Sequence, residues 1–90
     1  MKKKVQFGDR MRAIRELDAR GLLGPMPVLK TRRLLQNLEA GDVLEVRATD
    51  DASVHDFPAF CTSAGHELLM AEDKDGVLTF RIRKGGEMDN

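Results

Sequence analysis

The chain has few of the residues on which disulfide, metal or covalent chemistry depends. Cys61 is its only cysteine, so an internal disulfide framework is excluded. Two histidines and one cysteine do not make a recognisable zinc spacing. We therefore assign no metal site and no cofactor to this sequence.

Net charge is also absent, and this bears on the partners that the chain can attract. Lys and Arg total 15 and Asp and Glu total 15, so the formal net charge at pH 7 is zero. A neutral chain has no overall field for nucleic acid or an acidic membrane, so charge-driven contacts have to come from local patches. No apolar run reaches the length of a signal peptide or a membrane span. These features favour a cytoplasmic protein without a membrane partner.

The length of the chain limits its domain organisation. Ninety residues fit one small domain with a sufficient but modest core. Residues 1–12 are heavily charged and lack a hydrophobic period, which predicts a mobile N-terminal leader. The folded domain is expected to span residues 13–86, followed by a short tail at 87–90.

The hydrophobic periodicity predicts the element order βαβαββ. We expect strands at 13–18, 43–48, 66–72 and 77–83, with residues 73–76 joining the last two strands into an antiparallel hairpin. Helices fill the first two connections. Because crossovers between parallel strands are right-handed, both helices should cover one face of a four-stranded mixed sheet. The predicted fold class is α/β, in the form of an α+β two-layer sandwich.

The two helix starts are predicted from their capping residues. Pro25 suits the first helical position and Gly24 is an acceptable N-cap, while Gly41 lies just beyond the expected end of this first helix. Asp50 or Asp51 offers an N-cap for the second helix. An internal Pro58 removes one backbone donor, which predicts either a kink or a late start near residue 56. Apolar positions at helical spacing mark the buried face of the first helix: Val28, Thr31, Leu34, Leu35 and Leu38.

The start of the first helix is a candidate anion site. Its first N–H groups have no partner within the helix and the helix dipole is positive there. A cysteine at such a position would have a lowered pKa and would attack sulfane sulfur readily. Lys30 and Arg33 add positive charge beyond the first turn, which indicates either an acidic partner or a solvated polar face.

The residues around this turn resemble a known signature, Leu-Asp-x-Arg-Gly-x-x-Cys-Pro-x-Pro, that of the TusA/SirA-like sulfur carriers. The resemblance extends from about Arg15 to Gly86 and implies the same βαβαββ sandwich. Family members hold sulfur as a persulfide on the motif cysteine. They receive it from a cysteine desulfurase or a rhodanese-like donor and pass it to tRNA thiolation or another sulfur-using acceptor. The matching residues are Leu17, Asp18, Arg20, Gly21, Pro25 and Pro27.

By this resemblance, Gly24 stands at the position of the family's cysteine. The resemblance thus implies a sulfurtransferase-like carrier without its nucleophile, which is expected to be inactive in sulfur transfer. Asp18 and Arg20 would fix the preceding turn, and Pro25 with Pro27 would shape the helix start. Three explanations stay open: a natural paralogue that lost the chemistry, a chain whose cysteine was deliberately replaced, or a variant that uses another thiol.

Other readings of the same residues lead to different functions. Cys61 is the only alternative thiol, but it lies on the apolar stripe of the second helix, where a cysteine usually packs as a small hydrophobe. His66 follows a helix end without an identifiable nucleophile and is read as structural or exposed. The tetrapeptide 21–24 is a GxxG loop with basic residues nearby, so a weak RNA-binding or anion-binding module is the alternative class. A regulatory protein that only docks the family's partners is the third.

Overall fold

The computed structural model describes residues 14–86, so the predicted leader and the tail at 87–90 lie outside the described residues. The order of elements is βαβαββ, as predicted. Neither described helix is long and apolar enough to cross a membrane. The elements are β2 (Arg15–Ala19), α2 (Met26–Leu35), β3 (Val43–Ala48), α3 (Ser53–Ala64), β4 (Glu67–Lys74) and β5 (Val77–Arg83).

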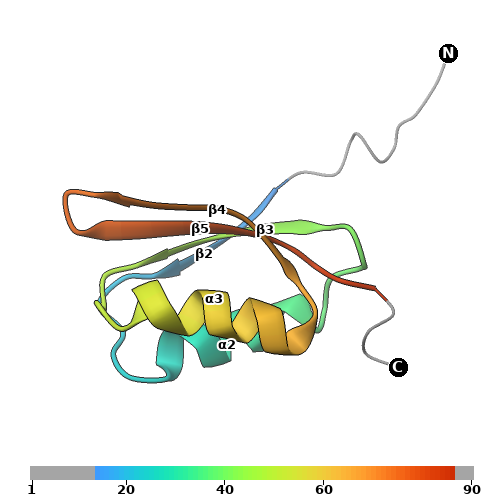
Figure 1. Ribbon diagram of the computed structural model, residues 1–90, viewed down its shortest axis with the longest axis horizontal. Helices are drawn as coiled ribbons and strands as arrows, with labels where there is room; N and C mark the ends of the chain where they lie inside the picture. Colours follow the sequence, from blue (N-terminus) through green and yellow to red (C-terminus); the bar gives the residue numbers. More distant parts are fainter. Residues whose placement is uncertain (1–13, 87–90) are drawn as a thin grey trace, which may run out of the picture.

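The strands form one mixed sheet in the order β2-β3-β5-β4. β2 runs parallel to β3, whereas β5 is antiparallel to both of its neighbours, β3 and β4. Both helices lie on the same side of this sheet (Figure 1). The structure therefore confirms the two-layer sandwich with two helices on one face.

The core lies between the sheet and the two helices. β3 and β5 alternate strictly, so Val46 and Phe80 are buried opposite each other in the register of the two strands. From the helices, Leu35 and Phe57 are fully enclosed, and the Phe57 ring stacks on Phe80 with ring centroids 4.5 Å apart. This layer of apolar side chains holds α2 and α3 against the sheet.

The other face of the sheet carries paired charges. Glu45 on β3 accepts from Arg81 on β5 at 2.8 Å and from Arg47 at 3.2 Å, and Arg47 also lies 3.5 Å from Glu16 on β2. The Glu45 side chain is only 17% exposed, so these pairs are partly shielded from water. They also balance the charge across three strands, so this part of the sheet is a polar surface.

The start of α2 differs by one residue from the prediction. Pro25 is the N-cap, and its carbonyl accepts the first helical hydrogen bond from the N–H of Leu29 at 2.9 Å. Gly24 was predicted to be the cap, but it adopts a left-handed φ of +66° and precedes the N-cap residue. The helix ends at Leu35, so Leu38 reaches the core from the connection that follows.

The start of α3 also differs. The helix begins at Ser53 and Pro58 lies inside it, so the predicted late start near residue 56 is wrong. The N-cap is Ala52 rather than Asp50 or Asp51. Asp50 still binds this segment, because its Oδ1 accepts from the N–H of Ala52 at 3.4 Å.

The closing hairpin is tighter than predicted. β4 continues to Lys74 and β5 begins at Val77, which leaves only Asp75 and Gly76 in the turn. Both have positive φ, 55° and 86° respectively. Two such residues are characteristic of a type I′ turn, whose twist matches that of the strands, so the Asp-Gly pair extends the pairing by two residues of β4.

Candidate functional site at the start of α2

The connection from β2 to α2, residues 20–25, meets the connection from β3 to α3. The two strands are parallel, so both connections leave from the same edge of the sheet. Two hydrogen bonds join them: the N–H of Gly21 donates to Thr49 Oγ1 at 2.8 Å, and the N–H of Gly24 donates to Asp50 Oδ2 at 3.0 Å. These contacts fix the loop in which the sequence motif lies.

Asp18 and Arg20 form a bidentate ion pair at the end of β2. Arg20 Nε and Nη2 lie 2.8 and 2.9 Å from the two carboxylate oxygens, and the Arg20 N–H adds a bond of 3.1 Å. These hydrogen bonds lower the pKa of Asp18 well below its usual range and raise that of Arg20. Because both side chains are about half exposed, the contact orients the turn more than it stabilises the fold.

The N–H of Gly24 already donates a hydrogen bond to a negatively charged side chain. The carboxylate of Asp50 occupies the donor that an external anion would use, and it lies at the positive end of α2. Pro25 and Pro27 have no N–H at all, so the helix start offers fewer donors than an ordinary one. The Asp50 carboxylate therefore occupies the anion site that was predicted at the start of this helix.

Exposed apolar side chains surround this loop, which the sequence analysis missed. Leu23 is 71% exposed, Met26 41% and Leu29 42%; we call these three residues the apolar rim. Their signal in the sequence was that Met26 and Leu29 fall off the buried stripe of α2, whereas Leu23 precedes the helix. Beside the rim, a groove of about 470 Å³ runs between α2 and α3 and is lined by Pro25, Val28, Leu29, Asp56, Ala59, Phe60 and Ser63.

The two predicted partner-binding residues lie on the exposed surface of α2. Lys30 and Arg33 are exposed and line a shallow depression together with Leu17 of β2. Neither lines the groove between the helices. Arg33 also lines a small hollow with Arg32 and with Leu29 of the apolar rim, so positive charge borders the apolar surface.

Cys61 and His66 both lie away from the loop at 20–25. Cys61 is 2% exposed within the hydrophobic core, and burial raises the pKa of its thiol to about 11. His66 accepts a hydrogen bond at Nδ1 from the N–H of Gly85 at 3.0 Å. The described structure therefore brings no thiol to Gly24.

Comparison with known proteins identifies the family to which this fold and this motif belong. The family model described as sulfurtransferase TusA matches residues 15–84. The chain belongs to this family. Its relatives include the sulfur carrier protein TusA of Allochromatium vinosum, which is 44% identical over 69 residues, covering 77% of this chain and 91% of that protein.

Two proteins of Bacillus subtilis extend the comparison. YrkI, a candidate sulfur carrier, is 43% identical over its whole length and 83% of this chain. YrkF, also a candidate sulfur carrier, is 47% identical over 86% of this chain, but the chain spans only 42% of YrkF. Among solved structures, the SirA-like protein of Desulfitobacterium hafniense matches with a TM-score of 0.72 and 30% identity over 80% of this chain and 99% of that one.

The buried thiol of this TusA-family chain gives a first prediction. Cys61 is expected to react with a disulfide reagent such as DTNB only after unfolding, because its native pKa of about 11 leaves almost no thiolate near neutral pH. The free energy of unfolding should also fall as the pH rises above about 9, since the unfolded thiol ionises before the native one. Thiol titration in buffer and in denaturant tests this. Full reaction in buffer would contradict it.

The contact between the two loops gives a second prediction. Asp50→Ala removes the acceptor of both the Gly24 and Ala52 N–H groups and is expected to lower the free energy of unfolding by about 1–2 kcal/mol. Asp50→Asn keeps an oxygen at this position and should lose less. Urea unfolding followed by circular dichroism measures both variants. Equal stability of Asp50→Ala and the unaltered chain would show that the contact contributes nothing.

Proposed function

We propose that this chain docks the sulfur donors or acceptors of a TusA-type carrier without itself carrying sulfur. The observation that carries the proposal is the state of position 24, where a glycine N–H is bonded to the Asp50 carboxylate and no thiol is present. Cys61 does not replace the missing group, because it is enclosed in the core.

The surface around Gly24 supports a docking role. The apolar rim of Leu23, Met26 and Leu29 exposes hydrophobic area at the loop itself, and clustered exposed apolar side chains mark sites of protein interaction. The adjacent groove continues this surface between α2 and α3. Lys30 and Arg33 lie outside it, where they would contact an acidic surface of a donor or an acceptor. The resemblance supplies the partners: a cysteine desulfurase or rhodanese-like donor and an acceptor such as one of tRNA thiolation.

Docking without transfer has a definite chemical consequence. Persulfide transfer requires a thiolate that attacks the outer sulfur of the donor persulfide, while the donor leaves as a thiolate. A docked chain with glycine at position 24 provides no attacking group, so the donor keeps its sulfur. The chain would then act as a competitor of cysteine-bearing carriers.

A competition experiment tests the proposal. A cysteine desulfurase with cysteine loads a cysteine-bearing TusA-family carrier, and intact mass spectrometry follows the sulfur on both carriers. The unaltered chain is expected to gain no sulfur and to slow the loading of the other carrier. Sulfur on the unaltered chain, or undiminished loading at saturating chain, would overturn the proposal.

Matched leucine variants locate the docking surface. Leu23→Asp on the apolar rim is expected to weaken the inhibition about tenfold or more, because a carboxylate is costly to bury in an apolar contact. Leu69→Asp, at another exposed leucine on β4, should inhibit like the unaltered chain. Equal effects of both variants would contradict docking through the rim.

The alternative of an RNA-binding module receives no support from the loop geometry. A phosphate clamp needs free N–H groups in the GxxG loop, but Gly21 and Gly24 donate to Thr49 and Asp50. The nearest guanidinium, that of Arg20, is paired with Asp18.

A further inference from the structure

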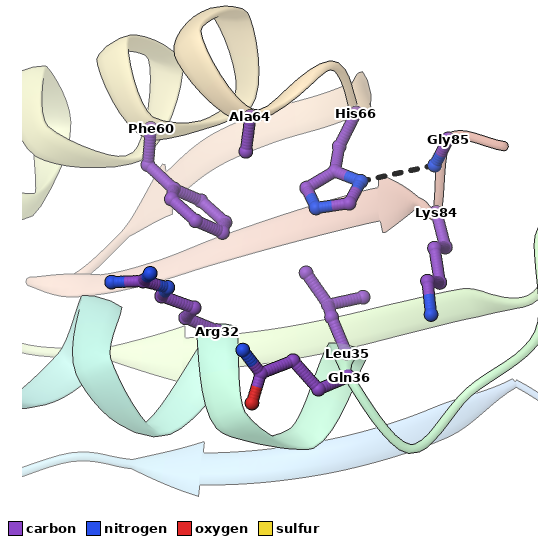
Figure 2. Close-up of a pocket in the computed structure, with 8 residues that line it drawn as sticks. All are labelled: Arg32, Leu35, Gln36, Phe60, Ala64, His66, Lys84 and Gly85. Carbon is purple, nitrogen blue, oxygen red and sulfur yellow. Dashed lines mark hydrogen bonds between the residues drawn. The ribbon is translucent and has the colours of Figure 1, made fainter. Parts of the chain in front are cut away.

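A second hollow, distinct from the loop at Gly24, lies where the C-terminal ends of α2 and α3 face the residues after β5 (Figure 2). It encloses about 340 Å³, and we call it the Arg32 cleft. Phe60 lines both this cleft and the groove beside the apolar rim. None of the residues at 20–25 lines it.

Two side chains of α2 and its C-cap supply donors to the cleft. Arg32 and Gln36 are four residues apart and therefore lie on one face of the helix end. Within residues 14–86, neither the guanidinium nor the side-chain amide makes a hydrogen bond or an ion pair, and no carboxylate lines the cleft. A guanidinium offers a planar fork of N–H groups that matches a carboxylate or phosphate.

The opposite wall adds positive charge and fixed geometry. Lys84 lines the cleft and donates from Nζ to the carbonyl of Leu38, which holds its ammonium group in place. The N–H of Gly85 donates to His66 Nδ1 at 3.0 Å, which fixes the orientation of the imidazole ring (Figure 2). The polar wall thus favours a negatively charged group.

The remaining wall of the cleft is apolar and aromatic. The Phe60 and His66 rings lie with their centroids 5.5 Å apart at 49°, and Leu35 forms part of the lining beside them. A flat ring fits against such a surface through dispersion and stacking. The volume is within the range of small-molecule sites, in which a few polar groups orient a mostly apolar contact.

We propose that the Arg32 cleft binds a small organic anion in which a phosphate or carboxylate is joined to a flat ring, directly or through a sugar. Arg32 and Gln36 hold the oxyanion, Lys84 adds positive charge, and the Phe60–His66 wall contacts the ring. A nucleoside monophosphate and an aromatic carboxylate share this chemistry.

Titration of the isotope-labelled full chain, followed by amide NMR, tests this site. The probes are AMP, benzoate, adenosine and inorganic phosphate. At least one of AMP and benzoate is expected to shift the Gly85 and His66 amides with saturation. Adenosine lacks the oxyanion and inorganic phosphate lacks the ring. The dissociation constants of both should therefore be at least about tenfold higher than that of the stronger probe. The stronger of the first two probes identifies which oxyanion the cleft prefers.

Two exposed arginines provide the matched variants. Arg32→Gln is expected to raise the dissociation constant of the bound probe about tenfold or more, because a charge-assisted hydrogen bond is lost. Arg15→Gln removes the same charge from β2, where the residue does not line the cleft, and should leave the constant unchanged. Both residues are exposed, so the amide spectra should retain the dispersion of the folded chain.

Three results would overturn the proposal. One is the absence of shifts with both AMP and benzoate at about 10 mM, which would fill most of a site with a dissociation constant near 1 mM. Another is an equal loss of binding in Arg32→Gln and Arg15→Gln, which would indicate non-specific attraction. The third is inorganic phosphate binding as tightly as the stronger of AMP and benzoate, which would remove the role of the aromatic wall.

Discussion

Gly24→Cys is expected to convert a chain that accepts no sulfur into one that gains a single reducible sulfur from a cysteine desulfurase. The new thiolate would attack the outer sulfur of the donor persulfide. The S–S bond of the donor breaks, the donor leaves as a thiolate, and a persulfide forms at position 24. The start of α2 lowers the pKa of a thiol there, whereas the nearby Asp50 carboxylate opposes ionisation.

This gain of function should come with a loss of stability. The φ of Gly24 is +66°, and a Cβ at this position would meet no atom within 4 Å, so the obstacle is backbone strain and not a clash. Left-handed conformation costs a residue with a side chain about 1–2 kcal/mol relative to glycine. Gly24→Cys should therefore lower the free energy of unfolding by that amount, unless the loop moves to negative φ.

Gly24→Ser is the matched control for this prediction. It has the same backbone strain and nearly the same shape but no sulfur, so it should lose the same stability and gain no mass from the desulfurase. Intact mass spectrometry and urea unfolding measure the two properties on each variant. Sulfur on Gly24→Ser would point to Cys61 as the carrier, and no sulfur on Gly24→Cys would remove position 24 from the proposed relay.

Phe57→Ala is expected to have the largest effect on folding. Phe57 is fully buried and its ring stacks on Phe80 at a centroid distance of 4.5 Å, so truncation leaves a cavity between α3 and the sheet. Substitutions of this kind cost about 3–5 kcal/mol. A domain of this size is stable by about 5–15 kcal/mol, so the variant should lose a large fraction of its stability.

Circular dichroism with urea is the appropriate measurement, because the chain has no tryptophan or tyrosine to report on unfolding by fluorescence. Val54→Ala provides the control, since Val54 lies on the same helix but is 49% exposed. It should change the free energy of unfolding by less than about 1 kcal/mol. A similar loss in both variants would mean that helix propensity, not core packing, is responsible.

The element order was predictable because its signals are local. Alternation in β3 and β5 follows from the two-residue period of a strand, and the helical stripe of α2 follows from its apolar spacing. The Asp75–Gly76 pair indicates a turn, but the expected connection was the four residues at 73–76. The pairing of β4 with β5, which is a contact between strands, extends as far as Lys74 and decides the tighter form.

The capping residues illustrate where local signals fail. Asp50 is a good N-cap by residue type, yet its carboxylate also accepts from Gly24, which is 26 positions away in the sequence. The bond exists because β2 and β3 are parallel and bring their following loops together. Similarly, the left-handed φ of Gly24 is set by its place between the end of β2 and Pro25, and not by its residue type alone.

The sequence by itself determined the family, the order of elements, the apolar stripes of the core and the absence of a thiol at position 24. Each of these depends on residue type or on spacing along the chain. Only the tertiary structure decided that Asp50 occupies the Gly24 donor, that Lys30 and Arg33 lie outside the groove between the helices, and that Arg32 and His66 line a second cleft. These features depend on contacts between distant segments, and no local pattern encodes such contacts.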